Sequence, residues 1–529
     1  MLHEAATNSS APTAGGDPHR QSDSASGVGV ARNTLLNLAG LGVPLVVGFA
    51  VIPVIASHLG PVRFGLLGLA WALLEYFSLV DGGLGRATTR FVAERAASRR
   101  DEIGPVVVAS IASQLGLATI AGAAVALAAP AVVGPLLPIP EGLRSEAVAT
   151  LRMLGAMLPV VVLGLGLRGI LEGAQRFDVS TLIRLPSSSA TFLVPAVGAV
   201  WGLSLPQIML FMLLARAATC AVMVVAVGRV LSGVRWSLPR QWRPLRPLLA
   251  YGGWVSVSNV VSPLLVQADR FVLGALAGLA AVGYYTAPYE LTTRMLVVAG
   301  SLTGAIFPAV SAFNALGARQ DLQRTFAMAV RTIALVMVPP AATLVAFAPD
   351  VLTAWMGEAT AGQGATALRI LAAGVVVNAL AFVPYACLQA LGRADLTAKF
   401  HVAELVLHLP LTWWLVREFG VAGAAGAWSI RVTLDAALLF AAARSSIGVS
   451  PRQLLGGRGG SAMLAMLALA GVLAAGTAVL PPLSPARAVA AAVAGLAFVY
   501  VVWRHVLTAP ERAALASSVT RVARGTRAA

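Results

Sequence analysis

Four pairs of ionisable side chains lie inside strongly apolar stretches of this chain, where a charge is costly unless it has a purpose or a partner. The pairs are Glu75 with Asp81, Arg168 with Glu172, Asp269 with Arg270, and Glu290 with Arg294. Buried charges of this kind usually face a cavity or neutralise one another. They are therefore the first candidates for ligand binding or ion coupling.

The spacing within each pair separates these candidates. The second and fourth pairs are four residues apart, so each pair shares one helix face and either forms a site or neutralises itself to help the helix insert. Asp269 and Arg270 are adjacent and cannot share a face, so at least one of them should point into a cavity. Asp81 precedes glycines near a helix end, where capping or loop packing explains it as well as transport does.

A second kind of chemistry is suggested by residues nearer the C-terminus. His401, Glu404 and His408 fall on one helical stretch and could form a metal site or a proton relay, but no further ligands accompany them, so no metal is expected. Arg216 and Arg431 lie in other apolar stretches. The planar fork of arginine suits phosphate, so either residue could hold an anionic headgroup; alternatively, each reaches the membrane interface or a partner acid.

Motifs typical of enzymes are missing from the sequence. It contains no GxxxxGK[ST], HExxH or GxSxG pattern, so neither ATP-driven transport within this chain nor hydrolytic catalysis is expected. Cys220 and Cys387 both lie in apolar runs and suit small fillers better than a disulfide or a metal site. We expect a protein that is not an enzyme and needs no cofactor.

The elements that position these residues must be membrane-spanning helices. The chain of 529 residues is 58% hydrophobic and only 11% charged, with a mean hydropathy of +0.82, whereas soluble domains carry about 25% charged residues. Apolar stretches of about 20 residues can each cross a bilayer. We predict an all-α polytopic protein of about fourteen spans near 33–57, 64–84, 104–133, 151–172, 180–201, 205–228, 248–278, 283–312, 327–349, 366–391, 396–416, 421–443, 461–480 and 485–507.

The basic residues indicate the orientation of these spans. The net charge is +16, almost entirely from arginine, and the arginines concentrate in loops that follow even-numbered spans, such as 85–103, 229–247 and 444–458. Positive loops stay on the cytoplasmic side. We therefore expect both termini in the cytoplasm, an inner-membrane location, and no nucleic-acid partner.

The chain also repeats itself at an offset of about 217 residues, most clearly where 151–178 aligns with 368–395. A weaker echo pairs Gly60 with Gly278 and Gly65 with Gly283. Six spans fit in each repeat, which predicts two lobes related by a pseudo-two-fold axis along the membrane normal. The predicted regions are a disordered cytoplasmic tail (1–31), an N-terminal lobe (32–230), a basic linker (231–247), a C-terminal lobe (248–445), two additional helices (446–508) and a basic cytoplasmic tail (509–529).

Several short motifs resemble the polysaccharide-biosynthesis flippases of the Wzx type. They are LGPVRFG at 59–65 and DGGLG at 81–85 with Arg90, and, in the second half, DR at 269–270 and GYY at 283–285. The resemblance covers roughly 32–445. That family belongs to the multidrug/oligosaccharidyl-lipid/polysaccharide exporter superfamily. Membership implies a central cavity that alternates between the two membrane faces, a lipid-linked oligosaccharide as substrate, cationic residues that hold its pyrophosphate, and a lipid tail beside the bundle.

From these observations we expect a flippase that translocates a polyprenyl-(pyro)phosphate-linked oligosaccharide to the outer leaflet by alternating access. The expected substrate-binding residues are Arg270, Arg294, Arg216, Asp269 and Glu290, and the candidates for coupling to H⁺ or Na⁺ are Asp269, Glu290 and Glu75. Membrane lipid and the glycosyltransferases or polymerase of the same pathway are the expected partners.

Other functions would fit parts of this pattern. A multidrug or small-molecule antiporter has the same fold, and so does a lipid II flippase, although the characteristic opening motif of that group is not present. A membrane enzyme such as a glycan polymerase or ligase usually carries a large polar outer loop, and the longest outer loops expected here, near 134–150 and 350–365, are short. A structural scaffold with a degenerate cavity is the remaining alternative.

Overall fold

The computed structural model describes residues 27–76, 84–95, 103–234, 236, 245–513 and 516. Within these residues the chain is helical, and one isolated bridge between Val133 and Leu137 is the nearest approach to a strand. The N-terminal bundle consists of α2 (Gly27–Tyr76), α3 (Leu84–Arg95), α4 (Ile103–Val132), α5 (Glu141–Gly173), α6 (Phe177–Val200) and α7 (Leu205–Val230).

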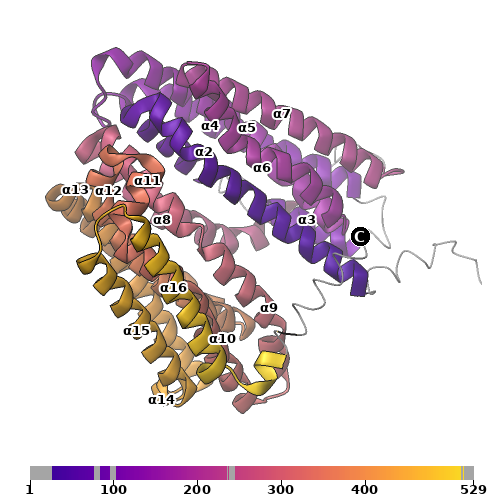
Figure 1. Cartoon of the computed structure of the whole chain (residues 1–529). Coiled ribbons are helices and arrows are strands. Elements are labelled where there is room, and N and C mark those ends of the chain that lie inside the picture. The colour runs from indigo at the N-terminus through magenta and orange to yellow at the C-terminus, as the bar shows by residue number, and fades with distance from the viewer. Residues whose placement is uncertain are drawn as a thin grey trace, which may run out of the picture.

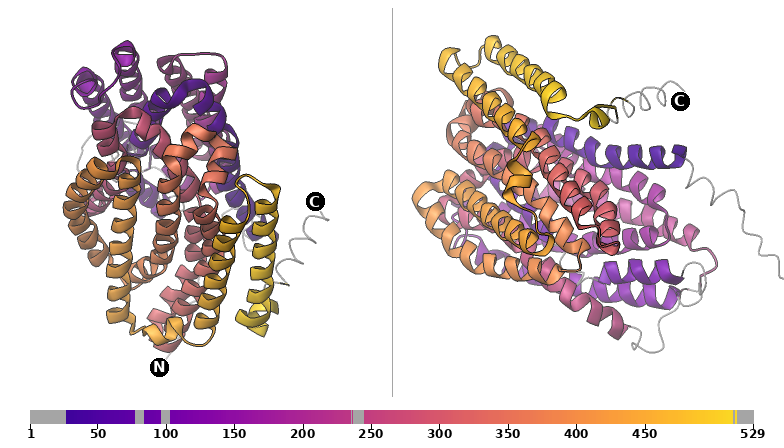
Figure 2. Two further views of the ribbon diagram at one scale, coloured as in Figure 1. Left: turned by 60° about the vertical axis from the view of Figure 1, so that its left-hand side comes forward. Right: turned by 90° about the horizontal axis from the view of Figure 1, so that it is seen from below.

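The C-terminal bundle follows. It consists of α8 (Leu245–Thr293), α9 (Leu296–Ala315), α10 (Arg319–Ala346), α11 (Ala348–Met356), α12 (Glu358–Ala390) and α13 (Ala394–Ile447). The chain ends with α14 (Pro451–Leu455), α15 (Arg458–Val479), α16 (Pro485–Val501) and a π-helical turn (Val502–Val506). Figure 2 shows α15 and α16 lying outside the second bundle. α15 packs on α10 and α16 packs on α15, and an apolar cluster that includes Phe347, Leu469 and Phe498 joins them.

Most helices of both bundles are membrane-spanning in length and composition; the short helices α3 and α11 are not. Among the described residues, 11 helical stretches are long and apolar enough to cross a bilayer. Large apolar side chains face outward, among them Leu127, Val406 and Val479, which are 70–81% exposed. Such a surface suits lipid rather than water. The prediction of an all-α polytopic membrane protein is therefore confirmed.

Three of these stretches hold two predicted spans each. α2, α8 and α13 contain single glycines in non-helical conformation, at Gly60 (φ 72°), Gly278 (φ 83°) and Gly420 (φ 54°). Positive φ is strained for residues with a Cβ, so glycine allows the chain to reverse there without a loop. With these breaks, the helices agree with the fourteen spans predicted from hydropathy, a number that stays a prediction.

The two bundles form two lobes with equivalent local structure. Figure 1 shows them in contact near the α4–α5 connection and α11, and diverging toward the opposite end. The turn between α5 and α6 has the same hydrogen bonds as the turn between α12 and α13: Arg176 N donates to Leu171 O, and Arg393 N to Leu388 O. These residues are 217 positions apart, so the repeat seen in the sequence corresponds to a structural duplication.

The lobes meet at one end through reciprocal glycine contacts, and we call this the closed end. A Cβ on Gly65 would lie 1.8 Å from the carbonyl oxygen of Leu279, and a Cβ on Gly283 would lie 2.4 Å from that of Pro61. Pro61 corresponds to Leu279 in the repeat, and Gly65 to Gly283, so the contact is symmetric about the pseudo-axis. Small residues permit such close backbone approach between membrane helices.

One element departs from the predicted loops. The segment after the second predicted span, expected to be a polar loop, contains the twelve-residue helix α3. α3 packs on α5, where Gly169 approaches Gly85 and Thr89, and Gly173 approaches Val92. Asp81, most of the predicted 231–247 linker and most of the predicted tails lie outside the described residues.

Candidate functional site

Four charged residues of the second bundle form what we call the C-lobe cluster: Asp269, Arg270 and Glu290 of α8, and Arg294 just beyond its end. Glu290 lies between the two arginines, accepting a hydrogen bond from Arg270 Nη2 at 3.1 Å and one from Arg294 Nη2 at 2.7 Å. The predicted shared face of Glu290 and Arg294 is therefore present. Two carboxylates and two guanidinium groups leave the cluster with no net charge.

Asp269 and Arg270 are both packed inside the protein, with side chains that are 0% and 1% exposed. The carboxylate of Asp269 accepts hydrogen bonds from the Tyr285 hydroxyl and from the Arg270 backbone N–H. The guanidinium of Arg270 lies 4.2 Å from the centre of the Tyr289 ring and donates to the Gly68 carbonyl of α2 at 3.4 Å. Arg270 thus reaches from one lobe to the other.

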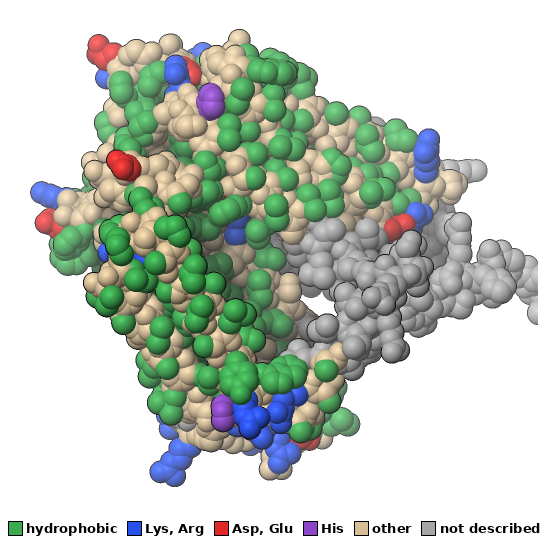
Figure 3. Space-filling model, viewed as in Figure 1, with side chains coloured by type: hydrophobic (Ala, Val, Ile, Leu, Met, Phe, Trp, Pro, Cys, Tyr) green, Lys and Arg blue, Asp and Glu red, His purple; other side chains and the backbone are tan. Residues whose placement is uncertain are grey.

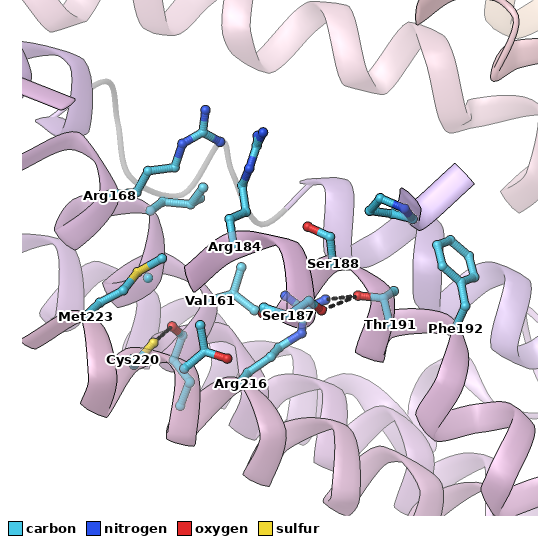
Figure 4. Close-up of a pocket in the computed structure, with 15 residues that line it drawn as sticks. Val161, Arg168, Arg184, Ser187, Ser188, Thr191, Phe192, Arg216, Cys220 and Met223 are labelled. Atoms are coloured by element: carbon cyan, nitrogen blue, oxygen red, sulfur yellow. Dashed lines mark hydrogen bonds between the residues drawn. The ribbon is translucent and has the colours of Figure 1, made fainter. Parts of the chain in front are cut away.

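A second group of charged side chains lines a cavity of about 360 Å³, which we call the N-lobe pocket. It lies among α5, α6 and α7, and its polar lining includes Arg168, Arg184, Ser187, Ser188, Thr191 and Arg216. Figure 4 shows Arg168 and Arg184 projecting side by side from neighbouring helices, with Arg216 extending toward Thr191. The pocket therefore gathers guanidinium and hydroxyl groups, which are the donors that bind phosphate oxygens.

The charges of the N-lobe pocket do not cancel. Arg168 donates to Glu172 at 2.6 Å, and Arg184 lies close enough to both to interact electrostatically. Arg216 Nη2 donates to the neutral Thr191 hydroxyl at 3.3 Å. Three guanidinium groups are thus accompanied by one carboxylate among the described residues. Two positive charges inside an apolar bundle favour an anionic ligand.

The two groups border one another through an aromatic ring. Phe192 lines the N-lobe pocket, and the Arg294 guanidinium lies 4.6 Å from the centre of its ring, a distance typical of a cation–π contact. Figure 3 shows that the surface is hollowed between the two lobes and that a basic side chain lies deep in this hollow. Arg294 of the second lobe therefore adjoins the lining of the N-lobe pocket in the first.

An apolar pocket of about 290 Å³ adjoins the C-lobe cluster between α2, α8 and α11, and we call it the side pocket. Glu290 and Arg294 form its polar part, and its apolar lining is Leu45, Phe49, Ile52, Leu291, Met295, Val298 and Trp355. Trp355 stacks on Phe49 at 5.0 Å and donates to the Phe49 carbonyl at 2.8 Å. Apolar walls beside arginine suit a ligand with an anionic head and a hydrocarbon chain.

The structure places the residues predicted from sequence in two groups. Asp269, Arg270, Glu290 and Arg294 lie together in the C-lobe cluster, and Arg216 lies in the N-lobe pocket. Glu75 is near the end of α2, and its side chain is outside the described part of the chain. Among the described residues, no group of histidine, cysteine and carboxylate side chains could hold a metal ion.

Sequence reasoning missed Arg184, and it left Arg168, one of its first candidates, out of the expected substrate-binding residues. A signal for the first was present, because Arg184, Ser187, Ser188 and Thr191 recur at the spacing of one helix face within a span. Arginine and hydroxyl side chains on one face of a membrane helix indicate a polar lining rather than contact with lipid.

The fold and the site define a polytopic membrane transporter with two lobes around a cationic space. The chain matches the family model for "Polysaccharide biosynthesis protein" over residues 30–314, and a second model, "MatE", matches residues 255–414. The first match covers more than half of the sequence. The chain therefore belongs to the polysaccharide biosynthesis protein family, which confirms the resemblance seen in its motifs.

Two relatives and two solved structures place the chain further. It is 29% identical over 412 residues to a "Putative O-antigen transporter" of Shigella flexneri, covering 78% of this chain and 96% of that protein. It is 24% identical over 218 residues to a "Probable low-salt glycan biosynthesis flippase" of Haloferax volcanii, covering 41% and 46%.

The structural likenesses concern the fold alone. The lipid II flippase MurJ in an inward closed conformation superposes with a TM-score of 0.68 at 12% identity, covering 89% of this chain and 99% of that one. An inward-facing multidrug transporter of the MATE family gives 0.65 at 17% identity, covering 78% and 98%.

Proposed function

We propose that this protein is a flippase that moves a polyprenyl-(pyro)phosphate-linked oligosaccharide across the inner membrane by alternating access. The single observation that carries the proposal is the N-lobe pocket, in which three arginines accompany one carboxylate within a membrane bundle. Family membership and the names of the two relatives support a glycan-lipid substrate. The excess positive charge also argues against a cationic drug as cargo, although a drug antiporter shares the fold.

Each part of such a substrate has a matching region in the described residues. The phosphates would lie against Arg168, Arg184 and Arg216, whose guanidinium groups neutralise phosphate charge and replace its water. Arg294 and Arg270 would exchange Glu290 for a phosphate oxygen as the substrate moves between the lobes. The first isoprene units would enter the side pocket, and the sugars would occupy the hollow between the bundles.

The direction of transport follows from the proposed orientation. With both termini in the cytoplasm, the closed end faces outward, and the hollow opens to the side on which the lipid-linked glycan is made. Arginine-bound phosphate would then be carried outward when the lobes part at the closed end and meet at the other. Asp269, Glu290 and Glu75 remain proposals for coupling to H⁺ or Na⁺, and enzymes of glycan synthesis remain proposals as partners.

The test is the leaflet accessibility of a labelled lipid-linked oligosaccharide in proteoliposomes that contain the purified protein. Arg216→Ala and Arg184→Ala each remove one charged hydrogen-bonding group, worth about 1.5–3 kcal/mol, so each should weaken substrate binding about 10- to 150-fold. Arg152→Ala is a matched control, because Arg152 is an exposed arginine of α5.

Two results would overturn the proposal. Wild-type rates in both Arg216→Ala and Arg184→Ala would remove the N-lobe pocket as the phosphate site. Transport of small cations without movement of any glycan lipid would identify a small-molecule antiporter instead. Equal movement of lipid II and of other glycan lipids would indicate a carrier that recognises the pyrophosphate rather than the sugar.

A further inference from the structure

Beyond these sites, α13 holds a group of ionisable side chains that we call the α13 cluster: Glu404 and Arg431, which are buried, and His401 and Asp435, which are partly buried. Because α13 reverses at Gly420, its first half brings Glu404 against the second half. Arg431 Nη1 lies 3.6 Å from Glu404 Oε2, and the Glu404 side chain is 0% exposed. Asp435 lies four residues after Arg431 on the helix face that Arg431 turns toward Glu404, and it interacts electrostatically with Glu404 and with His401.

The charges of the α13 cluster do not balance when its acids are ionised. Two carboxylates, Glu404 and Asp435, face the single guanidinium of Arg431. The C-lobe cluster, in contrast, pairs two carboxylates with two arginines. An uncompensated charge inside a membrane protein is costly. One bound proton would make the α13 cluster neutral.

The hydrogen bonding of the cluster is incomplete in the same place. Both carboxylate oxygens of Glu404, Oδ1 of Asp435, Nε of Arg431 and Nδ1 of His401 are buried and have no hydrogen-bond partner among the described residues. The 3.6 Å approach of Arg431 is an ion pair, too long for a hydrogen bond. A proton shared between two carboxylates satisfies an oxygen on each, because the protonated acid donates to the ionised one.

A proton fits this cluster better than a metal ion does. Sodium or a divalent ion needs several oxygen ligands around it, and the guanidinium of Arg431 would repel such an ion. No group that could hold a metal is present among the described residues. We propose that Glu404 and Asp435 share one exchangeable proton and that its binding and release couples transport to a proton gradient. This inference rests on the proposed function for its role in transport, although not for proton binding itself.

The position of Arg431 connects this cluster to the contact between the lobes. Arg431 also interacts electrostatically with Asp269 of α8, and Asp269 directly precedes Arg270, which donates to Gly68 of the other lobe. When the carboxyl pair carries a proton, its negative charge is smaller and it attracts Arg431 less. The attraction between Arg431 and Asp269 then becomes relatively stronger. The charge state of the pair would then bias the Arg270 contact across the lobes.

Two histidines also lie near the carboxyl pair. His401 and His408 lie on the same half of α13 as Glu404, and Arg431 interacts with both. His408 already shares a hydrogen bond with Thr412. His401 interacts with Asp435 and can pass the proton to the pair. In that step an N–H bond of His401, or an O–H bond of hydronium, breaks, and an O–H bond forms on one of the two carboxyl groups.

The test uses two variants of the whole protein, Glu404→Gln and Asp435→Asn, with Glu358→Gln as the control at an exposed position of α12. The first measurement is the infrared absorption of protonated carboxyl groups in purified protein as pH is varied, which needs no substrate. We expect a titrating carboxyl band in the wild type and in the control, and its loss in both variants. A band that persists in both variants would overturn the proton site.

The second measurement is glycan-lipid flipping in proteoliposomes with an imposed pH gradient. The wild type and the control should respond to the gradient, whereas Glu404→Gln and Asp435→Asn should flip at one rate with and without it. A response that survives in both variants, or a response only to a sodium gradient, would refute proton coupling here. Absence of flipping in the wild type, together with a band lost in the variants, would overturn the proposed function and leave the proton site standing. If one variant does not fold, the other carries both measurements.

Discussion

Adding a single methyl group at the closed end should force the lobes apart. In Gly65→Ala the new Cβ would lie 1.8 Å from the Leu279 oxygen, and in Gly283→Ala it would lie 2.4 Å from the Pro61 oxygen. Both obstacles are backbone atoms that cannot rotate away. To restore a contact of about 3.4 Å, the lobes must part by about 1.6 Å at the first position and about 1.0 Å at the second.

The added methyl group destabilises only the conformation in which the lobes touch at the closed end. Overpacking of this kind costs that conformation about 1–3 kcal/mol. Once the lobes separate there, the added methyl group meets nothing from the other lobe. A differential free energy of this size changes the ratio of the two conformations about 5- to 150-fold. Both variants should therefore favour the conformation that is open at this end.

The assay is a distance measurement between spin labels attached to cysteines at positions 136 and 359. Leu136 and Ala359 are exposed residues near the closed end of the first and second lobe. We expect the population of longer distances to rise in both glycine variants. Gly116→Ala is the matched control, because a Cβ on Gly116 of α4 would have nothing within 4 Å.

Three outcomes would contradict the predicted opening of the lobes. Distance distributions in Gly65→Ala and Gly283→Ala that match the wild type would show that the glycine contact does not limit opening. A shift in one variant alone would contradict the symmetry of the contact, since the two glycines exchange places across the pseudo-axis. An equal shift in Gly116→Ala would point to a general loosening of the fold.

Two further predictions concern stability. Gly392, with φ of 74°, and Gln175, with φ of 60°, occupy equivalent turns in the two lobes. Gly392→Ala should destabilise the protein by about 1–2 kcal/mol, whereas Gln175→Ala should change its stability little because Gln175 already bears that strain. An equal drop in the thermal unfolding temperature of the two variants would refute this prediction. Burial alone would raise the pKa of Glu511, but hydrogen bonds from Thr508 and the nearby charge of Arg331 bring it below its ordinary value of 4.5. Its ionised form therefore stabilises the fold above that pH, and this stability is lost as the pH falls through the lowered pKa. Glu511→Gln should unfold at a lower temperature than the wild type at pH 7 and at nearly the same temperature once the pH is well below the lowered pKa. A difference in unfolding temperature that widens in acid would contradict this prediction.

Local patterns in the sequence predict much of this fold. Hydropathy locates the spans because each must be apolar over its own length. The shared face of Glu290 and Arg294 follows from helix geometry alone. The equivalence of Gly60 and Gly278 follows from the repeat, and both glycines adopt positive φ at the same place in the two lobes.

The remaining features depend on how distant segments pack. Arg270 and Gly68 are 202 residues apart, so nothing local to either predicts their hydrogen bond. α3 was expected to be a loop because its sequence is too polar to span a membrane, whereas in the structure it is held on α5 by close approach at Gly169 and Gly173. The contact between Glu404 and Arg431 likewise needs the reversal at Gly420.

The single-glycine reversals at Gly60, Gly278 and Gly420 also restrict how this protein can change over evolutionary time. An ordinary loop absorbs an inserted or deleted residue, but here helix follows helix with one residue between them. Each added residue would rotate one span by about 100° about its axis. Such a rotation would turn Arg270 or Glu404 from the interior toward lipid. Related chains should therefore vary freely in length at their termini and at connections such as 133–140, and hardly at all at these three turns.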